Sequence, residues 1–387
     1  MKKITISETV KYIGVDDKDL DLFESQYQIP NGVSYNSYLI IDQKTAVMDT
    51  VDKRGCDKWL ENLERTLQGR TPDYLVISHM EPDHAGSFAA FAQKYPQAKW
   101  VGNARTFSML LQFFDVDLTD QTVVVAEGDT ISLGSHTLQF FMAPMVHWPE
   151  VMVTYEQSEK ILFSADGFGK FGALDIEDDW VDEARRYYFN IVGKYGAPVQ
   201  ALLKKASALD IQTICPLHGP VLMEDLGYYI GKYQTWSSYE PEDAGIFIAY
   251  ASIHGNTAKA AKKLADILEE KGAPRVVIMD LAREDQSRAV EHAFRYDRMV
   301  LAAASYDAGV FPPMEEFLCH LRAKNYSQRT VALVENGSWA PSAGKVMKEE
   351  LETMKDLSLV GEMVTIKSAI KEETIKELEA LADVLLQ

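Results

Sequence analysis

Cysteine is scarce in this 387-residue chain, which contains only Cys56, Cys215 and Cys319. These three lie far apart and include no C-x-x-C pair, so we expect no disulfide framework and no thiolate metal site, as in a reducing cytoplasm. No run approaches the roughly 18 apolar residues of a membrane span, and the polar start of the chain lacks the apolar segment of a secretory signal. Basic residues number 39 against 58 acidic ones, for a net charge of −19. Nucleic-acid binding requires a cationic face, so we expect neither a nucleic-acid partner nor membrane association.

The rest of the composition is that of a globular protein of about two domains, with 25% charged and 47% hydrophobic residues. In the first part, short apolar segments bounded by turn residues predict strands, and a long helical pattern covers 179–208. The expected strands are 36–42, 45–50, 74–79, 122–132, 136–143, 151–156, 160–166 and 212–216. Strands interleaved with helices predict sheets that are covered by helices.

A polar, acidic segment at 235–245 predicts a linker, so we place the first domain at residues 1–240 and the second at 241–387. After it, strands and helices alternate strictly. The expected strands are 245–252, 275–281, 298–305, 330–335 and 359–366, and the expected helices are 256–271, 284–294, 313–324, 343–354 and 369–386. Five such units predict a doubly wound, five-stranded parallel sheet with helices on both faces.

Seven side chains of metal-ligating type follow the ends of strands in the first part. Four of them fall within the six residues HMEPDH directly after the strand YLVIS, and the others follow later strands. Loops at strand ends are where such folds place their chemistry. A single histidine is usually structural, but four of the eight histidines lie in these loops, so the joint pattern indicates a metal centre. The candidates are His79, Glu81, Asp83, His84, His147, Asp166 and His218.

The motifs H-x-E-x-D-H, HWPE, SADGF and LHGP resemble the flavodiiron proteins, or A-type flavoproteins, of the metallo-β-lactamase superfamily. Glu81 stands where that superfamily also uses histidine, and a carboxylate there suits iron. The resemblance implies a metallo-β-lactamase-like αββα sandwich that holds a carboxylate-bridged diiron centre, with all seven residues catalytic. It assigns one iron to His79, Glu81 and His147, the other to Asp83, His84 and His218, and the bridge to Asp166.

A second candidate site opens the second domain, where SIHGNT leads from a strand into a helix. Backbone N–H groups and hydroxyls at a helix N-terminus can hold a phosphate without lysine or arginine, although such residues also cap helices that bind nothing. Two more loops, 304–313 and 335–341, each combine an aromatic with small residues. The candidate contacts are Ser252, His254, Gly255, Asn256, Thr257, Ser305, Tyr306, Asp307, Ala308, Gly309, Gly337, Ser338 and Trp339.

These three loops resemble the FMN site of flavodoxin and imply a flavodoxin-like second domain. Tyr306 and Trp339 are candidates to flank the isoalloxazine ring, and packing between the loops is the alternative for both side chains. A dinucleotide is disfavoured, because the second domain, 241–387, has no G-x-G-x-x-G motif.

The resemblance covers nearly the whole chain and implies an oxidoreductase that reduces dioxygen to water, nitric oxide to nitrous oxide, or both. Electrons would pass from an external donor, such as rubredoxin or a reduced deazaflavin, through FMN to the diiron site. Two ferrous ions and a reduced FMN together hold the four electrons that dioxygen requires. The family also implies a head-to-tail homodimer, or a homotetramer.

Two other functions remain open at this point. One is a dizinc hydrolase of the metallo-β-lactamase superfamily with an accessory flavodoxin-like domain, which Glu81 disfavours. The other is a flavodoxin-like electron carrier with a vestigial metal domain, which the full set of seven ligands disfavours.

Overall fold

The computed structural model describes residues 4–118 and 120–387, which divide into two compact units. The first unit contains the described residues up to Tyr188 together with Ala197–Gln234, and the second contains Phe189–Gly196 and Thr235–Gln387. The short segment Phe189–Gly196, although it lies within the first part of the sequence, therefore belongs to the second unit. Within the described residues, no helix combines the length and the apolar character needed to cross a membrane.

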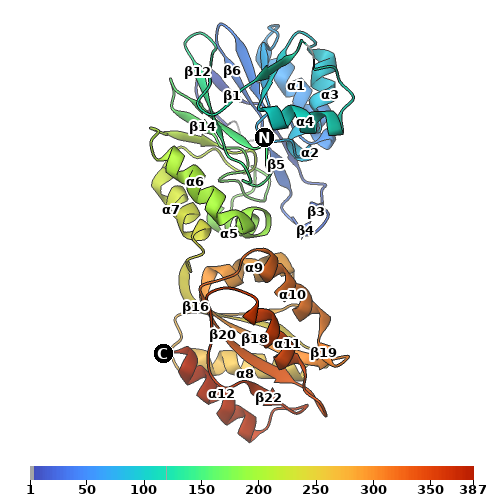
Figure 1. The fold of residues 1–387 in the computed structure, drawn as a ribbon, viewed down its shortest axis with the longest axis vertical. Coiled ribbons are helices and arrows are strands. Elements are labelled where there is room, and N and C mark those ends of the chain that lie inside the picture. Colours follow the sequence, from blue (N-terminus) through green and yellow to red (C-terminus); the bar gives the residue numbers. More distant parts are fainter. Residues whose placement is uncertain (1–3, 119) are drawn as a thin grey trace. The chain divides into compact units, whose positions relative to one another are not determined.

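Two sheets form the centre of the first unit (Figure 1). The six-stranded sheet has the order β1 (Val10–Tyr12), β6 (Tyr38–Ile41), β7 (Thr45–Met48), β8 (Tyr74–Val76), β9 (Lys99–Gly102) and β10 (Thr122–Val124). The five-stranded sheet has the order β11 (Thr130–Ser132), β12 (Thr137–Met142), β13 (Met152–Glu156), β14 (Ile161–Phe163) and β15 (Thr213–Cys215). Two small sheets pair β2 (Val15–Asp17) with β5 (Val33–Tyr35), and β3 (Leu22–Phe23) with β4 (Tyr27–Gln28).

Helices lie outside these sheets, and Figure 1 shows α1, α3 and α4 on one side and α6 and α7 on the other. They are α1 (Cys56–Leu67), α2 (Pro82–Ala85), α3 (Phe88–Lys94), α4 (Ala104–Phe113), α5 (Trp180–Tyr187), α6 (Gly196–Ala206) and α7 (Leu226–Ser237). Tyr38 and Val76 of one sheet share a buried cluster with Phe140 and Phe163 of the other. Since successive strand residues face opposite ways, each sheet turns one apolar face to this core and the other to helices. The expected αββα sandwich is confirmed.

The single strand expected over 122–132 is wrong, because β10 and β11 belong to different sheets. Between them Gly128 adopts a left-handed φ of 83°, and the carboxylate of Asp129 accepts a hydrogen bond from the Ala126 amide at 2.8 Å. These residues form a turn at which the chain leaves one sheet and enters the next.

The continuous helix expected over 179–208 is also wrong. After α5 the chain forms a π-helical turn, η2 (Tyr188–Val192), and a 3-10 turn, η3 (Gly193–Tyr195), before α6. Pro198 in α6 has no N–H to donate to the carbonyl of Lys194, four residues earlier. That carbonyl accepts instead from the Asn325 side chain at 2.9 Å, and the Gly193 carbonyl accepts from the Tyr239 hydroxyl at 2.8 Å. Proline thus interrupts the helix at the Lys194 carbonyl, and side chains of the second unit donate to the carbonyls of both Lys194 and Gly193.

The second unit is a parallel sheet between two layers of helices. Its order is β17 (Val276–Asp280), β16 (Asp243–Ala251), β18 (Tyr296–Tyr306), β20 (Arg329–Asn336) and β21 (Leu357–Leu359), with β22 (Val364–Ile366) also on β20 and β19 (Gly309–Val310) antiparallel to β18. The helices are α8 (Asn256–Glu270), α9 (Gln286–Arg295), α10 (Pro312–Ala323), α11 (Ala343–Glu352) and α12 (Glu372–Leu385). Ile246 and Ile248 pack with α8 and α12 in one buried cluster, so the alternate residues of β16 face the other layer. The expected doubly wound sheet is confirmed.

Two expected boundaries change in this unit. The fifth strand, expected over 359–366, is divided: β21 pairs with the beginning of β20 and β22 with its end. The linker expected over 235–245 is shorter, because α7 continues to Ser237 and β16 begins at Asp243.

Candidate functional sites

The seven candidate metal ligands converge from loops at the ends of strands. His79 follows β8, Glu81 precedes α2, and Asp83 and His84 lie within α2. The others follow β12, β14 and β15; they are His147, Asp166 and His218. Six of the seven are buried, and the Glu81 side chain is 13% exposed.

One group of four side chains surrounds a common point. The Glu81 Oε2 atom lies 3.2 Å from His79 Nε2 and 3.0 Å from His147 Nε2. The Asp166 Oδ2 atom lies 3.3 Å from each of the same two nitrogens. Two imidazole nitrogens and two carboxylate oxygens therefore face one another, each within reach of one cation.

A second group lies on the other side of the same aspartate. The Asp83 Oδ2 atom lies 3.1 Å from His218 Nε2 and 3.4 Å from His84 Nε2. The second oxygen of Asp166, Oδ1, lies 3.0 Å from His84 Nε2 and 3.8 Å from His218 Nε2. Asp166 therefore turns one carboxylate oxygen toward each group.

These groups fit a pair of metal ions better than a hydrogen-bonded cluster. Both carboxylate oxygens of Asp83 and Asp166 and both ring nitrogens of His84 are buried without a well-formed hydrogen bond among the described residues. Buried polar atoms are rarely left in that state. Two ligand atoms about 2.1 Å from one ion and at right angles to each other are about 3 Å apart, as the facing atoms are here. Imidazole and carboxylate ligands suit iron, zinc or manganese.

Two of the candidate ligand histidines are held by residues outside these groups. The Nδ1 atom of His79 lies 2.7 Å from Glu150 Oε1, which also accepts the Met80 amide at 2.9 Å. The Nδ1 atom of His218 lies 2.7 Å from the Ser34 carbonyl oxygen. Both contacts leave Nε2 directed at the centre and fix the orientation of the ring. Sequence reasoning assigned Glu150 no role, although this carboxylate lies three residues after a ligand in HWPE.

The charges of the centre keep its carboxylates ionised. Burial raises the pKa of Asp166, but the positive charge of His84 and the close imidazoles of His147 and His84 outweigh burial and hold this pKa well below its usual range. Burial likewise raises the pKa of Glu81, and hydrogen bonds from His147 and His79 lower it further than burial raises it. For His147, burial lowers the pKa, while Asp166 and Glu81 raise it to about 9. Metal binding requires neutral imidazoles and ionised carboxylates, so it would be coupled to release of a proton from a protonated His147.

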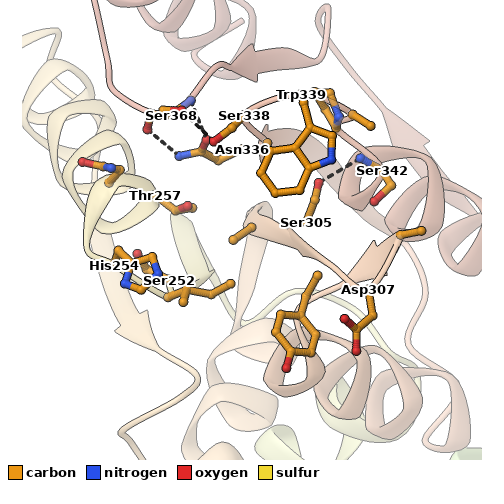
Figure 2. A pocket seen from close by; sticks show the side chains of 18 residues that line it. Ser252, His254, Thr257, Ser305, Asp307, Asn336, Ser338, Trp339, Ser342 and Ser368 are labelled. Carbon is orange, nitrogen blue, oxygen red and sulfur yellow. Dashed lines mark hydrogen bonds between the residues drawn. The ribbon is translucent and has the colours of Figure 1, made fainter.

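A pocket of about 630 Å³ lies at the carboxyl ends of β16, β18 and β20 in the second unit (Figure 2). This is the point where the order of the sheet reverses, the usual ligand position in such folds. Eleven of the thirteen candidate contacts line it: Ser252, His254, Asn256, Thr257, Ser305, Tyr306, Asp307, Ala308, Gly337, Ser338 and Trp339. Gly255 and Gly309 are not lining residues. Among the described residues, no lysine or arginine lines the pocket, whose size fits a cofactor.

The phosphate-type loop depends on Gly255 for its shape. Gly255 adopts φ 84° directly before α8, and its amide donates to the Ser252 hydroxyl at 3.1 Å. A residue with a side chain is strained in this left-handed conformation. The loop therefore brings the start of α8 to the pocket without a charged side chain.

Two lining residues, Ser342 and Ser368, lie outside the three loops that the sequence indicated, and both stabilise those loops. The Ser342 amide donates to the Ser305 hydroxyl at 2.8 Å, and the Asn336 side chain donates to the Ser368 carbonyl at 2.9 Å. The hydroxyls of Ser338 and Ser368 lie 2.7 Å apart. Figure 2 shows these residues along one side of the pocket. The sequence signals for these two serines are the position of Ser342 directly after the loop 335–341 and of Ser368 just beyond the fifth strand.

The two candidate aromatic residues are exposed at this pocket. Trp339 is 92% exposed and Tyr306 46%, so packing between loops does not account for Trp339. Tyr306 begins a hairpin between β18 and β19 whose two loop residues, Asp307 and Ala308, both have positive φ. Such two-residue loops match the twist of the strands. This tight turn holds Tyr306 at the edge of the pocket.

Two family models match the chain, one for each unit. The model described as ODP family beta lactamase matches residues 33–219, and the model described as Flavodoxin matches residues 248–380. A nitric oxide reductase of Moorella thermoacetica is 29% identical over 374 residues, which cover 93% of this chain and 92% of that protein. An anaerobic nitric oxide reductase flavorubredoxin of Vibrio vulnificus is 28% identical over 349 residues, covering 87% of this chain and 70% of its own length.

Solved structures share the fold over the full chain. The rubredoxin oxygen:oxidoreductase of Desulfovibrio gigas superposes with a TM-score of 0.92 at 24% identity, covering 99% of this chain and 98% of that one. The flavodiiron protein of Giardia intestinalis superposes with a TM-score of 0.91 at 23% identity, covering 100% and 96%. At these identities the likeness establishes the fold.

Proposed function

Because this chain belongs to the flavodiiron proteins, which join a beta lactamase-type metal domain to a flavodoxin domain, we propose that it reduces nitric oxide, dioxygen or both. The chain is an oxidoreductase whose cofactors are FMN and a pair of iron ions. Relatives named as nitric oxide reductases support nitric oxide as the substrate. The support for dioxygen as a substrate is the resemblance to the family. The observation that carries the proposal is the position of Asp166, with one oxygen in each ligand group.

The residues of the first unit would hold the two irons as the sequence motifs suggest. We assign His79, Glu81 and His147 to one ion, Asp83, His84 and His218 to the other, and Asp166 to both. When bound, the irons supply the positions at which a gas is reduced, and FMN supplies electrons to them. The protein would contribute oriented ligands, since Glu150 and the Ser34 carbonyl contact the Nδ1 atoms of His79 and His218.

The second unit would hold FMN in the 630 Å³ pocket. We assign the phosphate to the loop from Ser252 to Thr257, where the start of α8 favours an anion. We assign the ring system to the loops that carry Tyr306 and Trp339. The boundary between the metal-binding domain and the FMN-binding domain would then lie near residue 240.

Cofactor analysis and two anaerobic assays test this function. Protein expressed with ample iron should contain two irons and one FMN per chain, and the reduced protein should consume nitric oxide, dioxygen or both in separate steady-state assays. Two zinc ions per chain, with no gas consumption after reconstitution with iron, would instead support a dizinc hydrolase with an accessory flavodoxin-like domain. Flavin reduction with rubredoxin and with a reduced deazaflavin, compared by stopped-flow absorbance, would identify the external donor.

We further propose a head-to-tail homodimer, alone or paired into a tetramer, in which FMN of one chain serves the irons of the other. A two-fold interface creates two such composite centres. The test mixes a chain carrying His79→Ala with one carrying Asn256→Asp and Thr257→Asp, which place negative charge at the phosphate. A mixed dimer retains one intact centre and should recover about half of the activity per dimer. Mixed dimers that form in good yield without activity would refute transfer between chains.

A further inference from the structure

An apolar cavity lies under α6 in the first unit, next to the loops that carry two candidate ligands. Its volume is about 20 Å³, and it presents no polar surface. Its lining includes Val146, which precedes His147, and Gly167 and Phe168, which follow Asp166. The cavity thus lies within one residue of a ligand on two separate loops.

The wall of the cavity that α6 forms contains partly exposed residues. Val199 of α6 is buried at 1% exposure, whereas Leu202, Leu203 and Ala206 of the same helix are only partly buried. The cavity therefore lies between a partly exposed helix face and the buried metal loops.

Polar groups near the cavity are already engaged with one another. The Ser164 hydroxyl donates to the Gly167 carbonyl at 2.7 Å, and the Phe168 amide donates to the Tyr233 hydroxyl at 2.6 Å. A buried water needs about two to four polar partners, and cavities with apolar walls stay dry and take up apolar atoms or molecules. The walls of this cavity favour a small apolar ligand over water.

We infer that this cavity is a holding site for a diatomic gas next to the metal centre. Its volume exceeds the roughly 10–15 Å³ that one water-sized particle needs, so it accommodates one small molecule. Dioxygen and nitric oxide are both small and nearly apolar, so the transfer of either gas from water into this apolar cavity is favourable. The inference rests on the proposed function for the identity of the gas. The cavity itself is tested without turnover.

Noble-gas binding is the direct test of the cavity. Crystals of the holoprotein pressurised with krypton, which is chemically inert and close to dioxygen in size, should show krypton between α6 and the Val146 loop. Krypton found only elsewhere, or not at all, would overturn the inference. Val199→Ile adds one methylene to the wall and should reduce the krypton occupancy, whereas Val125→Ile makes the same change in a buried cluster away from the cavity and should not.

Gas kinetics link the cavity to the reaction. We expect Val199→Ile to raise the KM for the gas about fourfold, the factor that one buried methylene contributes to a binding constant, and more than it changes kcat. Leu202→Ala enlarges the cavity and should change the KM in the opposite direction. Equal KM values in Val199→Ile, Leu202→Ala and Val125→Ile would overturn the role in gas supply. Krypton in the cavity of a protein that consumes neither gas would refute the proposed function alone, and gas consumption without krypton there would refute this inference alone.

Discussion

Replacing Glu150 with glutamine tests how its contact with the proposed ligand His79 affects metal binding, while the His79 side chain itself is unchanged. Glu150 is buried, and its Oε1 atom contacts His79 Nδ1 at 2.7 Å and accepts the Met80 amide at 2.9 Å. Burial raises the pKa of Glu150, but the hydrogen bond from His79 outweighs burial and keeps this pKa below its usual range. The wild-type carboxylate is therefore ionised and makes the His79 ring a stronger base toward a cation. Glutamine keeps an oxygen at the contact and removes the charge.

The expected loss follows from this geometry. Removing the partner of a ligand histidine typically weakens metal binding by about 10- to 100-fold, or about 1.4–2.7 kcal/mol. In the Glu150→Gln variant an amide nitrogen would replace Oε2, which has no hydrogen-bond partner among the described residues, so a buried donor would also be left unpaired. The affinity for the ion assigned to His79, Glu81 and His147 should fall. The affinity for the other ion, assigned to Asp83, His84 and His218, should fall less.

Anaerobic titration of the apoprotein with ferrous iron against a competing chelator measures both affinities. Glu156→Gln is the matched control, because Glu156 is fully buried, accepts the Ser158 amide at 2.9 Å, and contacts none of the seven candidate ligands. Glu150→Gln should weaken the binding of one of the two equivalents of ferrous iron, and Glu156→Gln should weaken the binding of neither. If Glu150→Gln binds two irons as tightly as the wild type, or if both variants lose iron equally, the orienting role of Glu150 is wrong.

Three further predictions address the bridge, the flavin and a distant ion cluster. Asp166→Asn should lose one or both irons and all gas reduction while FMN absorbance is retained, since a neutral amide bridges two cations poorly; turnover by an iron-replete variant would contradict the bridge. Trp339→Ala should weaken FMN binding by about 1–3 kcal/mol in a fluorescence titration, the range for loss of aromatic stacking, and an unchanged affinity would remove Trp339 from the ring site. His136 lies 2.8 Å from Asp42 and 3.0 Å from Glu159; burial lowers its pKa, but hydrogen bonds to Glu159 and Asp42 raise it above its usual value. The contribution of protonated His136 to stability is therefore present below its pKa in the unfolded chain and is lost as the pH rises through its pKa in the folded protein. His136→Gln should lower the free energy of unfolding by about 1.5–3 kcal/mol near pH 5–6 and by less at higher pH. A urea series that shows the same loss at every pH would refute that sign.

The sequence by itself determined the chemistry of the metal centre and the order of elements in the second domain. Both are local properties: HMEPDH follows an apolar strand directly, and strict alternation of strands and helices leaves few arrangements other than a doubly wound sheet. The resemblance to a known family rested on the same short motifs. Local patterns also explain the errors, because the turn at Gly128 and the missing amide of Pro198 both lie inside runs that otherwise read as one element.

Only the tertiary structure decided which atoms face one another. Glu150 and His79 are 71 residues apart, and His218 and the Ser34 carbonyl are 184 apart, so no sequence pattern links them. The same holds for the two oxygens of Asp166, whose directions depend on loops from both sheets. The packing of Phe189–Gly196 with the second unit and the cavity under α6 are also products of long-range contacts. The type of each candidate ligand can be read from the sequence at that position. The orientation of the side chains and the cavity arise only when segments distant in the sequence pack together.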